Sequence, residues 1–174
     1  MKKSTKMLLI AYLAAAAAGV LLHFLYQWFP NPVLALISPV RESVWEHVKL
    51  LYFPLLVVSL VMGRGGKGAG CAPWLLGMIV SCAVMVGVGY LYHVTFRGES
   101  MIVDLALFFL PLALGFLLPR VLWLLCEWPG MDKAAWALAG LLGILIVWFT
   151  FFPPNTALFA DLSGALRTFL TIPV

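Results

Sequence analysis

Apolar residues fill most of the chain in long runs, and the polar residues gather between these runs. The first run, residues 7–29, holds 23 residues without a formal charge. A helix rises 1.5 Å per residue, so a run of this length can cross a hydrocarbon core of about 30 Å. Further runs predict helices over residues 39–62, 73–96, 101–126 and 134–152, followed by a tail over residues 153–174. The pattern predicts an all-α integral membrane bundle of five transmembrane helices that forms one domain, residues 1–174.

Prolines and glycines mark the ends of these helices. Ser38-Pro39 is typical of a helix start, with serine as the N-cap and proline at the first helical position. Pro153-Pro154 ends the last helix, because proline lacks the amide proton that continues a helix.

The composition supports lipid as the solvent. Hydrophobic residues make up 64% of the 174 residues and charged residues only 10%, against about 25% charged in soluble domains. The lipid bilayer is therefore the expected partner. The net charge of +4 does not indicate a nucleic-acid partner, because in a membrane protein the positions of lysine and arginine matter more than their sum.

The distribution of basic residues predicts the orientation. Seven lie on the amino-terminal side of the predicted bundle and four on the other side. Cytoplasmic loops carry the excess of lysine and arginine, so the amino terminus is expected inside, the carboxyl terminus outside, and the protein in the plasma (inner) membrane as a multi-pass protein. The seven are Lys2, Lys3, Lys6, Arg64, Lys67, Arg120 and Lys133, and the four are Arg41, Lys49, Arg97 and Arg167.

The richest polar segment, residues 41–49, stands at the predicted start of the second helix. On a helix, Glu42, Glu46 and Lys49 would share one face, with Ser43 and His47 beside them. Charged side chains below the headgroups need a partner, water or the bundle interior. Glu46 and Lys49 are therefore expected to form a buried structural pair, while the alternative is that Glu42 and Glu46 carry protons or bind a cation.

Other polar side chains are predicted at the same depth. His23 lies near the end of the first helix, His93 near the end of the third with Arg97 four residues later, and Asp104 near the start of the fourth. The tail could fold over this end and add Asp161. Together they predict an outward-facing polar pocket. Its expected lining is His23, Glu42, Ser43, Lys49, His93, Arg97 and Asp161, and its expected catalytic residues are Glu46, His47 and Asp104.

Two kinds of chemistry fit these residues. His23, His47 and His93 are candidate ligands for zinc, with one position left for water, although single histidines more often form structural hydrogen bonds. Ser43 and His47, at i and i+4, are alternatively a nucleophile and its base, oriented by Glu46 or Asp104. A hydrogen bond of Ser43 within its own helix is the simpler explanation.

The segment Ser38-Pro39-Val40-Arg41-Glu42-Ser43-Val44-Trp45-Glu46-His47-Val48-Lys49-Leu50 resembles a family of small bacterial membrane proteins classed as a domain of unknown function. The similarity extends over most of the chain, and it implies a helical membrane fold without an established activity. A looser similarity to ceramidase-like membrane hydrolases lies in Ser43, the histidines and Asp104, although their paired-histidine helix is missing.

Three functions remain open at this point. We expect an outward-facing pocket that binds or transports a small molecule or ion. The first alternative is a metal-assisted membrane hydrolase that acts on a lipid or envelope substrate. The second is a non-catalytic structural or accessory protein whose polar cluster only fixes helix packing.

Overall fold

The computed structural model describes residues 5–64, 70–123 and 130–162. Within these ranges every regular element is helical, which confirms the all-α prediction. The elements in chain order are α1 (Thr5–Trp28), α2 (Pro32–Ala35), α3 (Val48–Gly63), α4 (Ala72–Gly89), the π-helix η1 (Tyr90–Thr95), α5 (Met101–Leu122), α6 (Met131–Phe151) and the 3-10 helix η2 (Ala157–Phe159).

Four of the described helices are long and apolar enough to cross a membrane: α1, α5, α6 and the continuous helix Ala72–Thr95 formed by α4 and η1. They correspond to the predicted runs 7–29, 101–126, 134–152 and 73–96, of which residues 124–126 lie outside the described part. Large apolar side chains are exposed along these helices. A large exposed apolar surface of this kind suits contact with lipid, as the composition indicated.

The helix predicted over residues 39–62 begins instead at Val48. The prediction was therefore wrong for residues 39–47. In that stretch the chain forms bends and turns. The Glu46 carboxylate accepts the Val40 N–H at 2.9 Å, and the Ser43 hydroxyl accepts the Glu46 N–H at 3.2 Å. Polar side chains that bond the backbone in this way offer it an alternative to the helix.

A short helix, α2, forms upstream of this loop and was not predicted. Asn31 is its N-cap, because its side-chain oxygen accepts the N–H groups of Val33 and Leu34 at 3.1 and 3.0 Å. Pro32 follows at the first helical position. The cap-and-proline signal expected at Ser38-Pro39 is therefore used at Asn31-Pro32. The remaining helix α3 has 16 residues, about 24 Å of rise, which is less than the hydrocarbon thickness.

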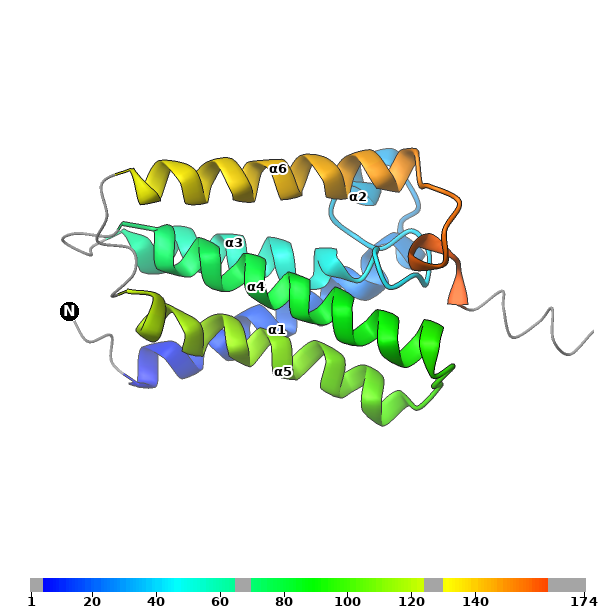
Figure 1. The fold of residues 1–174 in the computed structure, drawn as a ribbon, viewed down its shortest axis with the longest axis horizontal. Helices are drawn as coiled ribbons and strands as arrows, with labels where there is room; N and C mark the ends of the chain where they lie inside the picture. Colours follow the sequence, from blue (N-terminus) through cyan, green and yellow to red (C-terminus); the bar gives the residue numbers. More distant parts are fainter. Residues whose placement is uncertain (1–4, 65–69, 124–129, 163–174) are drawn as a thin grey trace, which may run out of the picture.

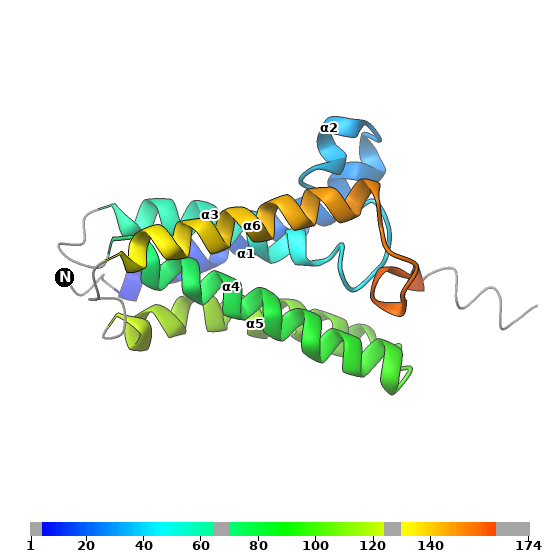
Figure 2. The same cartoon turned by 45° about the horizontal axis from the view of Figure 1, so that its top comes forward.

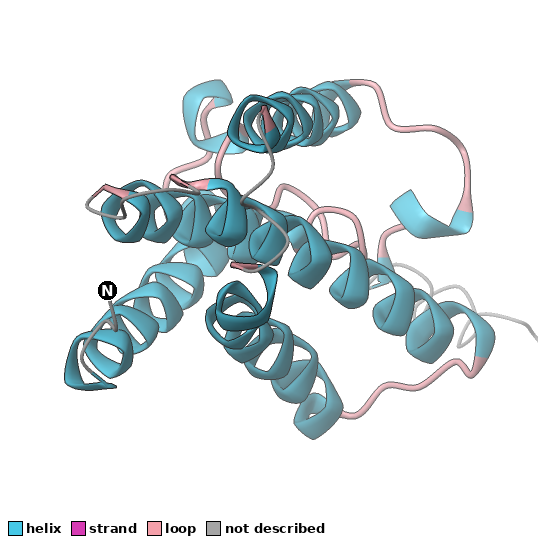
Figure 3. Ribbon diagram, turned by 60° about the vertical axis from the view of Figure 1, so that its left-hand side comes forward, coloured by secondary structure: helices cyan, strands magenta, loops and turns pink. Residues whose placement is uncertain are grey.

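The helices run side by side, with α4 in contact with α3, α5 and α6, while α1 contacts α3 and α5 (Figures 1 and 3). The core between them is apolar and contains the fully buried side chains of Leu51, Leu75, Met78, Leu112 and Ile146. At Gly77 the helices approach closely: a Cβ there would stand 3.3 Å from the Gly115 carbonyl of α5. Small residues at such crossings allow tight packing without a hydrophobic driving force.

The irregular segments gather at one end of the bundle. The ends of α1 and α6 meet the starts of α3 and α5 there, together with η1, α2 and η2 (Figures 1 and 2). Helix α2 stands out from the side of the bundle in Figure 2. We call this end the polar end, because it holds all three histidines, Glu42, Glu46 and Asp104. The fold thus brings the termini of separate helices, and the loop 39–47, to one level.

Candidate functional site

A buried ion pair holds the loop 39–47 in place. The Lys49 ammonium lies 2.8 Å from the Glu46 carboxylate, and the two residues are 0% and 3% exposed. The ammonium also donates to the carbonyls of Ala35 at 2.7 Å and Ser38 at 3.1 Å. With three acceptors around three donors, the ammonium is fully hydrogen-bonded. These bonds join α2, the loop and α3.

Ser38 connects the same loop to α1. Its hydroxyl donates to the Leu22 carbonyl at 2.5 Å and accepts the Tyr26 N–H at 3.0 Å. Leu22 directly precedes His23, so the bond fixes the turn of α1 that carries this histidine. The loop and the last turns of α1 are therefore positioned as one unit.

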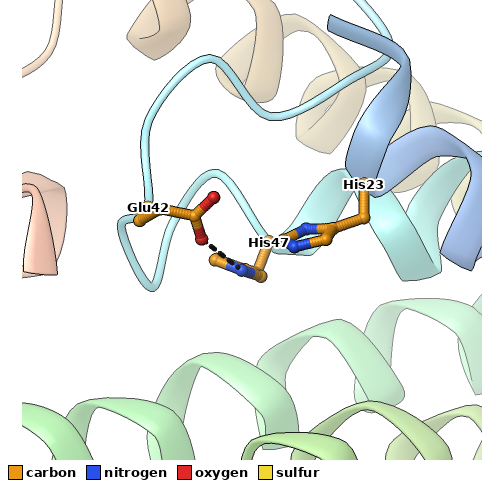
Figure 4. A group of neighbouring side chains, drawn as sticks. All are labelled: His23, Glu42 and His47. Atoms are coloured by element: carbon orange, nitrogen blue, oxygen red, sulfur yellow. Dashed lines mark ion pairs between the residues drawn. The ribbon is translucent and has the colours of Figure 1, made fainter. Parts of the chain in front are cut away.

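Three side chains of this unit come together: His23 from α1, and Glu42 and His47 from the loop (Figure 4). Each offers one possible metal-ligating atom, and these atoms all lie within 4.8 Å of one another. Nε2 of His47 is 3.3 Å from the Glu42 carboxylate, and the two imidazole rings are 5.4 Å apart between centroids. We call this group the His-Glu-His cluster.

The backbone of the loop fixes the proton on His47. Its Nδ1 lies 2.7 Å from the Ser43 carbonyl, which only accepts, so Nδ1 carries a proton. Nε2 therefore faces the Glu42 carboxylate either as a second N–H or as a lone pair directed at a shared cation. Metal-binding histidines have this arrangement, with one nitrogen donating to a carbonyl and the other free to ligate.

Burial and the contact between His47 and Glu42 have opposite effects on the pKa values of these two side chains. Burial opposes the charged form of His47, but its hydrogen bond with Glu42, its bond to the Ser43 carbonyl and the charges of Glu42 and Asp104 together raise its pKa. The same hydrogen bond to His47 lowers the pKa of Glu42 in spite of its burial. Without a metal, the geometry favours an imidazolium–carboxylate pair.

His23 differs from His47 in its surroundings. Its Nδ1 is buried and has no hydrogen-bond partner among the described residues. A buried polar atom without a partner costs free energy, roughly 1–3 kcal/mol, so such an atom in a native structure requires an explanation. A bound ion, or a water molecule held by it, would give His23 its missing partner.

His93 lies in a different pair. Its Nε2 is 3.2 Å from the Asp104 carboxylate, and its Nδ1 is 3.0 Å from the Gly98 carbonyl. The π-helical turn η1 places His93 over the start of α5, and the next residues include Arg97 at a positive φ of 53°. Asp104 is close enough to His47 to influence its charge. His93, the histidine expected as the third metal ligand, is thus outside the His-Glu-His cluster and is bonded to Asp104.

The remaining predicted site residues are placed as follows. Ser43 is 1% exposed, and its hydroxyl accepts the Glu46 N–H, which is a turn contact within the loop. Arg97 is exposed on the connection between η1 and α5. Asp161 lies in the tail next to Leu162, whose N–H donates to the Glu42 carbonyl at 2.8 Å. Glu46 and Lys49 lie in the buried pair, apart from the His-Glu-His cluster.

The described part of the tail packs against the loop. Besides the Leu162 bond, the Trp45 N–H donates to the Leu158 carbonyl at 3.3 Å, and the Trp45 ring contacts Phe149 and Phe159. Residues 163–174 of the predicted tail lie outside the described residues. Sequence reasoning placed Glu42 in the pocket lining and not among the metal ligands. A glutamate five residues before a histidine is not a recognised metal-binding motif. The contact between Glu42 and His47 is therefore evident only from the geometry of the loop.

No curated protein and no solved structure matches this chain in the comparisons. A family model matches residues 1–166, almost the whole chain, and its description states no activity. This agrees with the resemblance carried by the segment around Trp45. The chain belongs to the family described as "Family of unknown function (DUF6512)".

Proposed function

We propose that this protein binds a divalent transition-metal ion, with zinc as the best fit, through His23, Glu42 and His47. The observation that carries the proposal is the convergence of two imidazoles and one carboxylate from α1 and the loop, with ligand atoms within 4.8 Å of one another. Two histidines and one glutamate are a recurrent zinc ligand set in which the fourth position stays open. Imidazole and carboxylate together suit zinc better than magnesium or calcium, which prefer oxygen ligands alone.

The distances are compatible with a bound ion. Tetrahedral zinc with bonds near 2.0–2.1 Å holds its ligand atoms roughly 3.4 Å apart. The His47–Glu42 distance of 3.3 Å already meets this value. The other separations, up to 4.8 Å, require movements of about an ångström, which side-chain rotation supplies.

The competing explanation is an imidazolium–carboxylate pair between His47 and Glu42. That pair accounts for two of the three side chains. It does not account for His23. The ring of His23 lies 5.4 Å from the ring of His47, which is charged in such a pair, and its Nδ1 has no hydrogen-bond partner among the described residues. A metal ion uses both imidazoles and the carboxylate at once. Metal binding is therefore the more complete explanation.

The position of the cluster favours a site on one membrane face over a path across the membrane. Residues 50–63 of α3 and 105–119 of α5 contain no acidic, basic or histidine residue. Ion carriers place such residues near the middle of the bilayer. We propose that α3 adds a fifth, short span, that the amino terminus is cytoplasmic, and that the His-Glu-His cluster faces the outer side of the plasma membrane.

A metal-assisted hydrolase is the second candidate. The observation in its favour is the His93–Asp104 pair, whose carboxylate is close enough to His47 to influence it. A zinc ion with three protein ligands makes a bound water acidic, and a nearby carboxylate can accept its proton. Asp104→Asn should then abolish hydrolysis of ester- or amide-linked lipids while zinc stays bound. Full turnover by that variant would reject this role for Asp104.

Equilibrium binding of zinc to the purified, metal-stripped protein tests the main proposal. We expect one zinc per chain, and a loss of at least 100-fold in affinity for His47→Gln and Glu42→Gln, since each removes a ligand. His93→Gln is the matched control, because it removes a histidine at the same end of the bundle. Equal affinity for all variants, or a dependence on His93 alone, would contradict the assignment.

A further inference from the structure

A pocket at the polar end lies apart from the residues of the His-Glu-His cluster. The pocket has a volume of about 350 Å³ and lies between the loop and the tail. It is lined by Arg41, Pro153, Pro154, Asn155, Thr156, Ala157, Phe159 and Ala160. This size is at the lower end of the range of ligand pockets, large enough for a headgroup fragment.

The lining has the chemistry of an anion site. Arg41 carries the positive charge, and Asn155 and Thr156 can add uncharged donors. Among the described residues that line the pocket, none is acidic. Two acidic residues adjoin the lining in sequence: Glu42 is directed at His47 (Figure 4), and Asp161 follows Ala160 in the tail.

The guanidinium of Arg41 is oriented by the end of α6. One of its nitrogens donates to the Thr150 carbonyl at 3.0 Å. Arginine has five N–H donors in a planar fork, so this bond orients the guanidinium and leaves further donors that can bond phosphate oxygens. Lysine in the same place would offer a point charge without this fork.

Aromatic side chains place the pocket at headgroup depth. Trp148, Phe151 and Phe152 are exposed at the end of α6, immediately before the pocket residues. Exposed aromatic residues at the end of a membrane helix are typical of the boundary between the hydrocarbon and the headgroups. The ring of the lining residue Phe159 packs against Trp45, whose buried indole N–H has no hydrogen-bond partner among the described residues.

From this we propose that the pocket binds the phosphate-bearing headgroup of a membrane lipid, with Arg41 as its main contact. The inference is independent of the metal proposal, because it rests on different residues. A phosphate in the headgroup layer would meet the guanidinium fork, Asn155 and Thr156 at once. A lipid bound there would also join the tail to the loop that carries Glu42, since Arg41 precedes Glu42 in the chain.

Titration of the full-length protein in uncharged detergent tests this, with bound lipid counted by native mass spectrometry. The probes are dihexanoyl phosphatidylglycerol, dihexanoylglycerol, which lacks phosphate, and inorganic phosphate. We expect saturable binding of one phospholipid and no binding of the phosphate-free lipid. Arg41→Gln should weaken phospholipid binding about 10- to 100-fold, as expected for a lost charge-assisted bidentate contact.

Controls separate recognition from folding. Arg97→Gln removes an exposed arginine at the same end outside the pocket and should bind lipid like the wild type. If Arg41→Gln does not fold, Arg41→Lys and Thr156→Val test the proposal in its place, because both variants retain a positive charge in the pocket. Each should still weaken phospholipid binding several-fold. Wild-type affinity in both, or equal binding of the phosphate-free lipid, would overturn the proposal. Inorganic phosphate binding as tightly as the phospholipid would overturn the lipid assignment.

Discussion

The Lys49 ammonium lies 2.8 Å from the Glu46 carboxylate in a part of the protein where both side chains are buried. Removing one partner of such a pair leaves a buried charge without compensation, which typically costs about 3–5 kcal/mol. Glu46→Gln is therefore expected to lower the melting temperature strongly in detergent. Glu99→Gln, at an exposed position, is the control and should leave it unchanged. A Glu46→Gln protein as stable as the wild type would show that the pair does not hold the loop.

The metal-free protein should have a pH-dependent stability that comes from Glu42 and His47. The pKa of His47 is raised above 6.5, so its contribution is complete below 6.5 and is lost as the pH rises through the raised value. The pKa of Glu42 is lowered below 4.5, so its contribution is present above 4.5 and is lost as the pH falls through the lowered value. With a chelator present, the contribution of the Glu42–His47 pair to stability should be largest between about pH 4.5 and 6.5.

Glu42→Gln provides the internal comparison for this profile. The variant removes the hydrogen bond and the charge that raise the pKa of His47, so the decline in stability should begin at a lower pH than in the wild type. Melting curves recorded from pH 4 to 9 for both proteins measure the difference. Superimposable profiles would mean that the two side chains do not interact in solution.

The backbone at Arg97 predicts a stabilising substitution. Its φ of 53° lies in the left-handed region, where an ordinary residue costs about 1–2 kcal/mol and asparagine less. Arg97→Asn should therefore raise the stability by roughly 0.5–1 kcal/mol, measured by thermal unfolding in detergent. Arg120→Asn is a useful comparison, since Arg120 is in the regular helix α5, and that change should not stabilise. A destabilised Arg97→Asn protein would argue that the turn is not left-handed.

The orientation can be tested by labelling single cysteines in intact cells. We expect a membrane-impermeant maleimide to label Asn155→Cys from outside and to leave Arg64→Cys unlabelled until the cells are opened, in a background without native cysteines. Asn155 is exposed at the polar end, and Arg64 directly follows α3 at the other end. The reverse labelling pattern would place the polar end in the cytoplasm.

The long helices could be predicted because their signal is local. An apolar run of about 20 residues reports its own length, so residues 7–29 and 73–96 correspond to Thr5–Trp28 and Ala72–Thr95. The start of α3 could not be predicted, because Asn31-Pro32 and Ser38-Pro39 both have the sequence pattern of a helix start, an N-cap residue followed by proline. The choice between them depends on Lys49 reaching back to the Ala35 and Ser38 carbonyls, which is a non-local contact.

The site shows the same limit. Its residue types and its position at one end of the bundle follow from the sequence, because His23, His47 and Asp104 all stand at the ends of apolar runs. Which of these side chains pair with one another could not be predicted from the sequence. On a continuous helix Glu42, Glu46 and Lys49 would share a face, whereas the loop separates Glu46 with Lys49 from Glu42 with His47.

The most direct test of the metal proposal is the first coordination shell of the metal, measured by X-ray absorption on protein loaded with one equivalent of zinc. We predict two imidazole nitrogens and one carboxylate oxygen at about 2.0–2.2 Å, with one further light atom. The Glu42→Gln and His23→Gln proteins should each lose their ligand from this shell, while His93→Gln should give the wild-type spectrum. A shell of oxygen atoms alone, or one that changes with His93 and not with His23, would contradict the His-Glu-His site.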